Sequence, residues 1–315
     1  VYYDLGRDAA FDSRLMGWIN TIRERVRTGA QPPGEFVALS HLLHDMRLFK
    51  SKAETELMRQ AAQISAGAHV RAMQAVRPGM YEYQLEAEYL HEFMRHGARS
   101  PAYPSIVGGG ANGCILHYIE NSAPLKDGDL VLVDAGCELH NYASDITRTF
   151  PVNGKFSGEQ RALYELVLAS QYAAIEATHT GNHWNVPHET VVRILTEGLV
   201  DLGLLAGHVD DLIEEQSYQR FFMHRTGHWL GLDVHDVGDY RVGGEWRQLE
   251  PGMTLTVEPG LYIAPDDDTV EERWRGIGIR IEDDVLVTNE GCDVLTRDVP
   301  KAIDDIEALM REARA

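Results

Sequence analysis

Two aspartates flank a polar connection in the segment VLVDAGCELHNYASDITRTF, which spans residues 131–150. Asp134 ends one apolar run, and Asp145 opens the next. A carboxylate is costly to remove from water unless it is paired, hydrogen-bonded or bound to a metal. The two residues therefore predict either strand ends that face water or a site that binds cations.

A second acidic pair lies nearer the C-terminus. In MTLTVEPG, an apolar strand that starts at Met253 ends on Glu258. In GIGIRIEDDVLV, period-two alternation places Arg280 and Glu282 on one face and the isoleucines on the other. Four carboxylates brought together raise one another's pKa values unless cations are present. Two divalent ions would balance the four charges, and oxygen-rich ligation with at most one imidazole suits an ion such as Mn²⁺.

The imidazole ligand has three candidates, His224, His228 and His235, in FFMHRTGHWLGLDVHDVGDY. The glycines there favour a strand or loop beside a close backbone approach over a helix. A lone histidine is more often a packed or surface residue, but three of them beside a carboxylate set favour a site. A fourth, His117, follows a glycine run in GGGANGCILHY. That run is either a substrate cradle or a flexible turn, and it lacks the lysine of a phosphate loop.

Composition excludes several classes of partner. The net charge of −20 disfavours nucleic acid, because like charges repel at long range. No apolar run reaches the roughly 18 residues of a membrane helix. The 3 cysteines are odd in number and have no paired spacing, which is typical of a reducing, cytoplasmic compartment. We therefore expect neither nucleic acid nor a membrane as a partner.

The elements that must position these residues recur in two halves. Capping boxes that begin at Ser51 and at Ser157 predict long helices, and each is followed by a second helix and then by strands. The predicted order is helices 51–77 and 82–96, strands 130–135 and 146–152, helices 157–179 and 187–202, strands 254–258 and 277–287, and a last helix from 302. This order predicts an internally duplicated α+β domain over residues 48–315. Residues 1–47 predict a strand, a helix and a Gly/Pro loop, and we expect them to be the end of an N-terminal domain.

Five segments of the chain resemble the bacterial Xaa-Pro aminopeptidases, also called aminopeptidase P, which are metallopeptidases of the pita-bread fold. The segments are GGGANGCILHY, VLVDAGCELHNYASDITRTFPVNGKFS, GHWLGLDVHDVG, LEPGMTLTVEPGLYI and GIGIRIEDDVLVT, in the family's order. The resemblance covers nearly all of the chain from about Leu48 onward. It implies a pita-bread fold with pseudo-two-fold symmetry, two adjacent metal ions, usually Mn²⁺, and assembly into dimers or tetramers.

The resemblance also implies a role for individual residues. It implies that the metal ligands are Asp134, Asp145, His228, Glu258 and Glu282, with Asp145 and Glu282 bridging the two ions. It further implies three supporting histidines at His117, His224 and His235, an arginine at Arg280, and a position near the substrate at Tyr262. Some relatives carry Gly-Leu where this chain has Arg225 and Thr226, a departure that bears on substrate fit rather than on metal binding.

The implied reaction releases the N-terminal residue from peptides with proline second, by a hydroxide shared between two metal ions. The amine is expected near Asp134, and Glu258 is expected to orient the hydroxide and shuttle its proton. His224 and His235 are expected to stabilise the oxyanion. His117 is expected to position the substrate, and Arg280 is expected to hold Glu282.

Alternatives within and outside this enzyme class stay open. A prolidase cuts Xaa-Pro dipeptides with much the same ligands, but it needs a cationic group for the dipeptide carboxylate, which the sequence does not locate. A non-catalytic pita-bread module that binds peptides or proteins has typically lost metal ligands, whereas this chain has a residue type that can bind metal at all five ligand positions. Methionine aminopeptidase and creatinase-like, metal-free chemistry are disfavoured by the pattern around the last glutamate and by the complete ligand set.

Overall fold

The computed structural model describes residues 1–315 and divides the chain into two compact units, Val1–Arg47 and Leu48–Ala315. The helices are α1 (Ala9–Glu24), α2 (Leu39–Leu48), α3 (Lys52–Ala75), α4 (Glu82–Arg95), α5 (Gly158–Ala177), α6 (Val186–Asp201), α7 (Val209–Glu214) and α8 (Ile303–Glu312). Short 3-10 turns η1 to η4 span Val26–Thr28, Gly110–Cys114, Ser217–Arg220 and Glu272–Trp274. None of these helices has both the length and the apolar character that crossing a bilayer requires.

In the first unit, α2 is a helix that the sequence did not lead us to expect. The backbone N–H of Ser40 and its hydroxyl both donate to Asp4 Oδ1, over 2.9 and 2.6 Å. The first turn of α2 is therefore held by a carboxylate 36 residues earlier in the chain. A cap of this kind leaves no local signal at the helix start.

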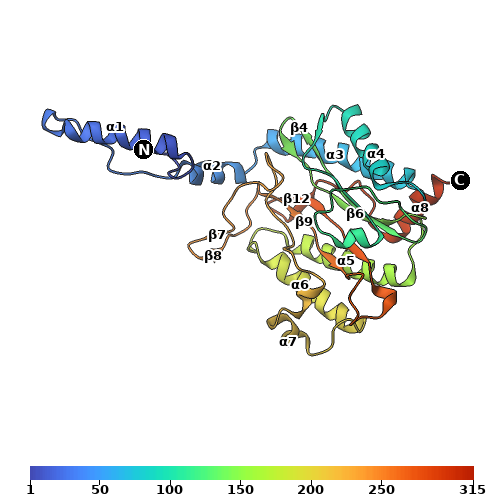
Figure 1. Cartoon of the computed structure of the whole chain (residues 1–315). Helices are drawn as coiled ribbons and strands as arrows, with labels where there is room; N and C mark the ends of the chain where they lie inside the picture. The colour runs from blue at the N-terminus through green and yellow to red at the C-terminus, as the bar shows by residue number, and fades with distance from the viewer. The chain divides into compact units, whose positions relative to one another are not determined.

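In the second unit, two helix pairs cover the strands. Ser51 and Ser157 form the capping boxes expected of them, at the starts of α3 and α5. Helix α3 packs against α4, and α5 packs against α6 (Figure 1). Alanines line the buried face of α3 and allow α4 to approach closely. The two helix pairs are confirmed, and so is the α+β class.

The strands form small antiparallel sheets. They are β1 (Ser100–Pro101), β2 (Ile106–Gly109), β3 (Leu130–Asp134), β4 (Cys137–Leu139), β5 (Tyr142–Ala143), β6 (Thr147–Pro151), β7 (Arg241–Val242), β8 (Glu245–Trp246), β9 (Thr254–Val257), β10 (Gly260–Tyr262), β11 (Gly278–Arg280), β12 (Asp283–Val287) and β13 (Cys292–Val294). The first half holds the sheet β2-β3-β6, and the second half holds β13-β12-β9. Asp134 pairs with Thr147, and Val257 pairs with Asp283, so both acidic pairs stand where two neighbouring strands end.

Two strand predictions need correction. The connection between Asp134 and Asp145 is not a plain loop, because it contains the hairpin β4–β5, which pairs with β1. The single strand predicted over 277–287 is divided into β11 and β12, which pair with β10 and β9 in different sheets. Glu282 lies at the point where the chain changes partner. Both faces are buried there, so the predicted two-sided alternation does not describe it.

Backbone contacts across the two halves bring the acidic pairs together. The N–H of Glu282 donates to the Thr147 carbonyl over 3.0 Å, and the N–H of Asp145 donates to Asp284 Oδ2 over 3.0 Å. The fully buried guanidinium of Arg148 donates to the Glu282 carbonyl over 2.5 Å and to Asp283 Oδ1 over 2.7 Å. The segments that carry the four acids are therefore fixed against each other.

Candidate active site

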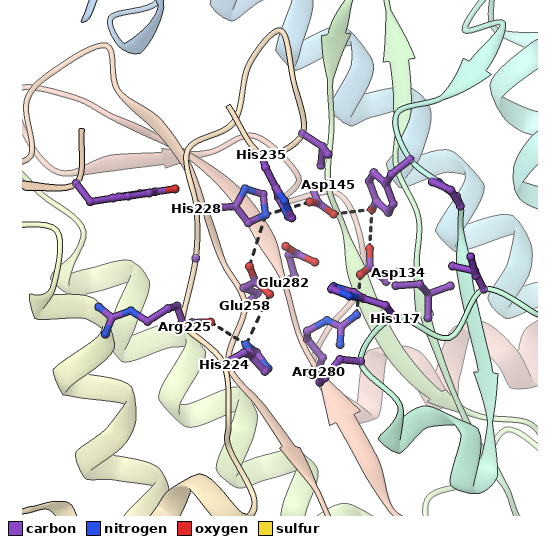
Figure 2. Close-up of a pocket in the computed structure, with 18 of the residues that line it drawn as sticks. His117, Asp134, Asp145, His224, Arg225, His228, His235, Glu258, Arg280 and Glu282 are labelled. Atoms are coloured by element: carbon purple, nitrogen blue, oxygen red, sulfur yellow. Dashed lines mark hydrogen bonds and ion pairs between the residues drawn. The ribbon is translucent and has the colours of Figure 1, made fainter. Parts of the chain in front are cut away.

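A cavity of about 660 Å³ lies over these strand ends. Nine of the ten residues expected at the site line it, namely His117, Asp134, Asp145, His224, His228, His235, Glu258, Arg280 and Glu282. Figure 2 shows the carboxylates and His228 directed toward one another from both halves of the domain.

Three of the expected metal ligands converge most closely. One ligand atom each from Asp145, His228 and Glu282 lie within 4.8 Å of one another. His228 Nε2 lies 3.4 Å from Asp145 Oδ2 and 3.6 Å from Glu258 Oε1. The opposite ring nitrogen, Nδ1, lies 2.9 Å from the Trp229 carbonyl, a contact that requires a proton on Nδ1. Nε2 is therefore the nitrogen that faces the carboxylates.

Tyr103 joins two of the carboxylates, and the sequence did not single it out. Its hydroxyl lies 2.6 Å from Asp134 Oδ1 and 2.5 Å from Asp145 Oδ1. Burial, followed by the charges of these two aspartates, raises the pKa of Tyr103 well above its usual value, so the phenol keeps its proton. One hydroxyl proton can serve only one carboxylate at a time. The two aspartates are thus close enough for their carboxylates to repel each other when both are ionised and no cation is bound.

The raised pKa values of the carboxylates in the cluster show that ionising them together in a buried site is unfavourable. Burial raises the pKa of Glu258 to about 7, against the opposing charges of His228 and Arg280. Burial, and then the charges of the neighbouring carboxylates, raise the pKa of Glu282 well above its usual value and also raise that of Asp145. Burial alone would lower the pKa of His228, but its hydrogen bond to Asp145 and the charge of Glu258 raise it to about 9. At pH 7 and without a metal, side chains of this cluster therefore bind protons, and a bound cation would take the place of that positive charge.

Two threonines orient the glutamates. The Thr147 hydroxyl donates to Glu282 Oε2 over 2.6 Å, and the Thr256 hydroxyl donates to Glu258 Oε1 over 3.2 Å. Neither threonine was among the residues expected at the site. A signal was present, because Thr256 stands two residues before Glu258 and Thr147 two residues after Asp145, and residues two apart share a strand face.

Arg280 contacts a different acid from the one expected. Its guanidinium donates to Asp134 Oδ2 over 2.6 Å, to Thr147 Oγ1 over 3.0 Å and to the Tyr262 hydroxyl over 3.0 Å. The expected direct contact with Glu282 is replaced by an indirect one through the Thr147 hydroxyl. The reason is that β11 lies against β3 and β6 of the first half, which places Arg280 beside Asp134 and Thr147.

His224 and Tyr262 also differ from their expected roles. His224 Nδ1 lies 2.7 Å from the Arg225 carbonyl, and Nε2 lies 2.8 Å from the Tyr262 hydroxyl, so both ring nitrogens are engaged within the protein. Burial, then the charge of Arg280, lowers the pKa of His224 to about 4, which leaves the ring neutral at pH 7. It has no spare N–H for an oxyanion. Tyr262 is buried behind the cavity wall, where it joins His224 to Arg280.

His235 and His117 keep the positions expected of them at the cavity. The ring of His235 lies 4.3 Å from that of His228, edge to face. Burial, then the charges of His228 and His117, lowers the pKa of His235, so this ring is also neutral at pH 7 and keeps one N–H donor. His117 follows η2 (Gly110–Cys114) and lines the same cavity.

The far wall of the cavity is aromatic and carries a cation, Arg225, that was not among the residues expected at the site. Trp184, Tyr240 and Trp246 line it, with the rings of Trp184 and Tyr240 4.6 Å apart. Arg225 lines the cavity beside them, and its guanidinium lies 5.4 Å from the centre of the Trp246 ring. Residues so far apart in the sequence gave no pattern from which this wall could be predicted.

The donor set fits divalent cations. Four carboxylates and one imidazole nitrogen face one cavity, and the raised pKa values of Asp145, Glu258 and Glu282 show that ionising them together needs a compensating charge. Oxygen-rich ligation of this kind suits hard or borderline ions. The three cysteines are free and none lines the cavity, so thiolate ligation plays no part.

Known proteins are similar to this chain in sequence and in fold. The Xaa-Pro aminopeptidase of Haemophilus influenzae is 59% identical over 269 residues, which are 85% of this chain and 62% of that protein. The Xaa-Pro aminopeptidase of Escherichia coli is 52% identical over 314 residues, which cover 100% of this chain and 71% of that protein. The solved structure of Pseudomonas aeruginosa aminopeptidase PepP has a TM-score of 0.95 and 64% identity, over 100% of this chain and 71% of that chain.

The chain therefore spans 62% to 71% of the length of these relatives. The structural match confirms the pita-bread fold that the sequence segments implied. The model of the metallopeptidase family M24 matches residues 56–289, a range that contains every residue of the cavity wall described above. The chain belongs to the metallopeptidase family M24.

Proposed function

We propose that this chain releases the N-terminal residue from peptides with proline in the second position, using two divalent ions, with Mn²⁺ as the metal. The observation that carries the proposal is the convergence of Asp145, His228 and Glu282, flanked by Asp134 and Glu258, in one cavity. The names of the H. influenzae and E. coli relatives support the same activity.

The five ligands proposed from the sequence would hold the ions. When bound, the two ions supply an acidified water as the nucleophile and polarise the scissile carbonyl. Asp134 lies at the end of the acidic cluster and binds the free α-amine, which sets the cut one residue into the peptide. Glu258 takes the proton of the nucleophile and passes it to the proline nitrogen, which must be protonated to leave.

Two histidines act on the substrate rather than on the metal. His235 is neutral and donates its N–H to the carbonyl oxygen as negative charge develops there. His117 orients the substrate backbone. His224 does neither, because the Arg225 carbonyl and the Tyr262 hydroxyl occupy its two nitrogens. We assign it instead to the positioning of the segment that leads to His228.

A dipeptidase is the second candidate, and one observation favours it. A dipeptidase needs a cation for the carboxylate of its Xaa-Pro substrate, and Arg225 provides a guanidinium in the cavity. Against it, this side chain points away from the metal ligands in Figure 2, and its guanidinium lies over the Trp246 ring. A proline carboxylate next to the cleaved bond would lie on the side of the ligands.

Hydrolysis of Ala-Pro-Ala and of Ala-Pro separates the two candidates. The protein is stripped with a chelator and assayed with and without Mn²⁺, and products are identified by mass spectrometry. Mn²⁺-dependent release of Ala from the tripeptide, with little from the dipeptide, supports the proposal, whereas preference for the dipeptide moves the assignment to a dipeptidase. Failure to cleave either peptide and to bind metal would refute both.

Three further expectations stay predictions. They are assembly into dimers or tetramers, a cytoplasmic location, and the assignment of residues 1–47 to the end of an N-terminal domain. Size-exclusion chromatography with light scattering tests the first. Limited proteolysis, followed by a stability measurement on the fragment that resists it, tests the last.

A further inference from the structure

We propose that Arg225 forms a carboxylate-binding subsite that receives the C-terminal carboxylate of short peptides reaching beyond the proline. The inference rests on the proposed function, since it names the substrate feature that the same cavity selects. The sequence alone showed only that Arg225 and Thr226 replace the Gly-Leu pair of some relatives.

The first observation is the direction of the side chain. Arg225 follows His224, whose ring points to the acidic cluster, and the Arg225 side chain points the opposite way (Figure 2). Asp134, which takes the substrate amine in the proposed function, lies on the other side of the cavity. A peptide bound by its amine at Asp134 therefore extends toward Arg225 with its C-terminal end.

The second observation is how the guanidinium is held. Its Nη2 donates to Asn185 Oδ1, and Asn185 Nδ2 donates to Glu189 Oε1 over 2.5 Å, which fixes the amide orientation. The guanidinium also lies 5.4 Å from the centre of the Trp246 ring. A planar guanidinium that rests on an aromatic ring and is tied at one nitrogen loses little freedom when it binds an anion.

The third observation is charge. No carboxylate lies within ion-pair distance of Arg225, and its side-chain hydrogen bond is to the neutral Asn185 amide. The charge of Glu189 acts on the guanidinium, but Glu189 Oε1 accepts from Asn185 Nδ2. Arg280, the other guanidinium of the cavity wall, is already paired with Asp134. Arg225 is thus the guanidinium in the cavity that can still form the bidentate contact typical of arginine and carboxylate.

Arg241 offers a matched control. Its guanidinium lies 3.9 Å from the centre of the same Trp246 ring, but Arg241 does not line the cavity. Both arginines thus stack on one indole from different positions, and only one of them is open to the substrate. Arg225→Gln and Arg241→Gln each remove one positive charge near that ring.

The test measures binding of the product Pro-Ala and of Pro-Ala amide to the Mn²⁺-loaded protein by calorimetry, so it does not depend on turnover. We expect the acid to bind roughly 10- to 100-fold more tightly than the amide, the range of a hydrogen bond to a charged group. In Arg225→Gln the ratio falls to about 1, and in Arg241→Gln it stays at the wild-type value. Arg225→Lys keeps the positive charge but loses the two parallel N–H donors of the guanidinium, so the ratio of acid to amide affinity should be intermediate.

Equal binding of acid and amide by the wild type, or a preference that survives in Arg225→Gln, overturns the inference. If only Arg241→Gln loses the preference, the subsite belongs to Arg241 and the inference is overturned. The inference is also overturned if neither probe binds. Metal content and thermal unfolding of each variant show whether it is folded. Ala-Pro-Ala hydrolysis tests the proposed function separately: a protein that fails to cleave but keeps the acid preference retains the subsite and loses the function.

Discussion

The Arg280 guanidinium donates to Asp134 Oδ2 over 2.6 Å, and both side chains are mostly shielded from water. The contact joins β11 of the second half to β3 of the first, across 146 residues of sequence. Removing one partner of a buried pair leaves the other with an uncompensated charge, which costs more than the pair itself contributes. The orientation of one proposed metal ligand therefore depends on a side chain from the other half.

Arg280→Gln tests this dependence. The variant should lose about 10- to 100-fold in Mn²⁺ affinity or in kcat/KM for Ala-Pro-Ala, because a group that orients a ligand is removed. The measurement is metal content after dialysis, together with steady-state kinetics. Arg275→Gln is the control, since the Arg275 guanidinium donates only to the Val270 carbonyl. Wild-type affinity and rate in Arg280→Gln would show that Asp134 holds its position unaided.

His228→Ala tests the ligand assignment itself. His228 is the imidazole of the convergent group, and its Nε2 faces Asp145 and Glu258. We expect nearly all turnover to be lost and fewer than two Mn²⁺ ions per chain to remain, as measured by elemental analysis. His96→Ala, at the exposed end of α4, should change neither value. Full metal content and rate in His228→Ala would refute the assignment.

Glu82→Gln tests how the segment that carries His117 is held. Glu82 is fully buried, and each of its oxygens accepts two hydrogen bonds: Oε1 from Gly109 N and Asn112 Nδ2, Oε2 from Tyr118 OH and Ala123 N, over 2.8 to 3.0 Å. An amide turns one acceptor into a donor and leaves two donors unsatisfied, at roughly 1–3 kcal/mol each. We expect a lower free energy of urea unfolding and a higher KM for Ala-Pro-Ala.

Glu88→Gln on the same helix is the control for that variant. Glu88 is partly exposed and pairs with Arg71 over 2.6 Å, so its loss should change the free energy of unfolding by less than about 1 kcal/mol. If Glu82→Gln raised neither KM nor the sensitivity to urea, the four converging donors would have found other partners. The loop would then be held by Asn121, which accepts from Val107 N and donates to the Ser105 carbonyl.

The features that could be predicted are those that neighbouring residues in the sequence determine. Ser51 and Ser157 were identified as caps because their capping-box partners stand three residues later. The acids Asp134 and Glu258 were noticed because an apolar strand ends on each of them. These features depend on neighbours within one turn or one strand, so a single sequence displays them.

The unpredicted part depends on contacts between distant segments. Tyr103 stands in SPAYPS without any pattern, and only the folded chain brings its hydroxyl between Asp134 and Asp145. The change of partner strand at Glu282 is set by β9 and β10, which end at Val257 and Tyr262, well before it in the chain. The contact of β11 with β3 and β6 brings Arg280 to Asp134, a neighbour 146 residues away that the spacing of Arg280 and Glu282 does not reveal.

His69 predicts how stability depends on pH. Burial lowers its pKa from 6.5 to about 3, with its Nε2 3.0 Å from the Ala135 carbonyl and its Nδ1 3.0 Å from the Tyr89 hydroxyl. The folded chain keeps the ring neutral while the unfolded chain binds a proton below pH 6.5. The stability that this group contributes is therefore complete above pH 6.5 and is lost as the pH falls toward 3.

His69→Gln should flatten that dependence. Between pH 6 and pH 4, the wild-type free energy of urea unfolding should fall more steeply than that of the variant, by up to about 1.4 kcal/mol per pH unit. The difference between the two slopes is the measured quantity, because carboxylates elsewhere titrate equally in both proteins. Parallel curves would mean that the ring is protonated without cost in the fold. His208→Gln, at an exposed position without a side-chain capping hydrogen bond, should leave the slope unchanged.

Metal binding should release protons. In the metal-free cluster the pKa of Glu258 is raised to about 7, that of His228 to about 9, and that of Glu282 well above its usual value, so cations must displace protons at neutral pH. Apparent Mn²⁺ affinity should therefore rise as the pH is raised from 6 to 9. Calorimetry in buffers of different ionisation enthalpy counts the protons released. Glu258→Gln should release fewer protons near pH 7, whereas the exposed Glu250→Gln should match the wild type. An affinity that does not change over this range would show that the raised pKa values do not belong to the metal-free protein, and the case for a cation between these carboxylates would lose its electrostatic basis.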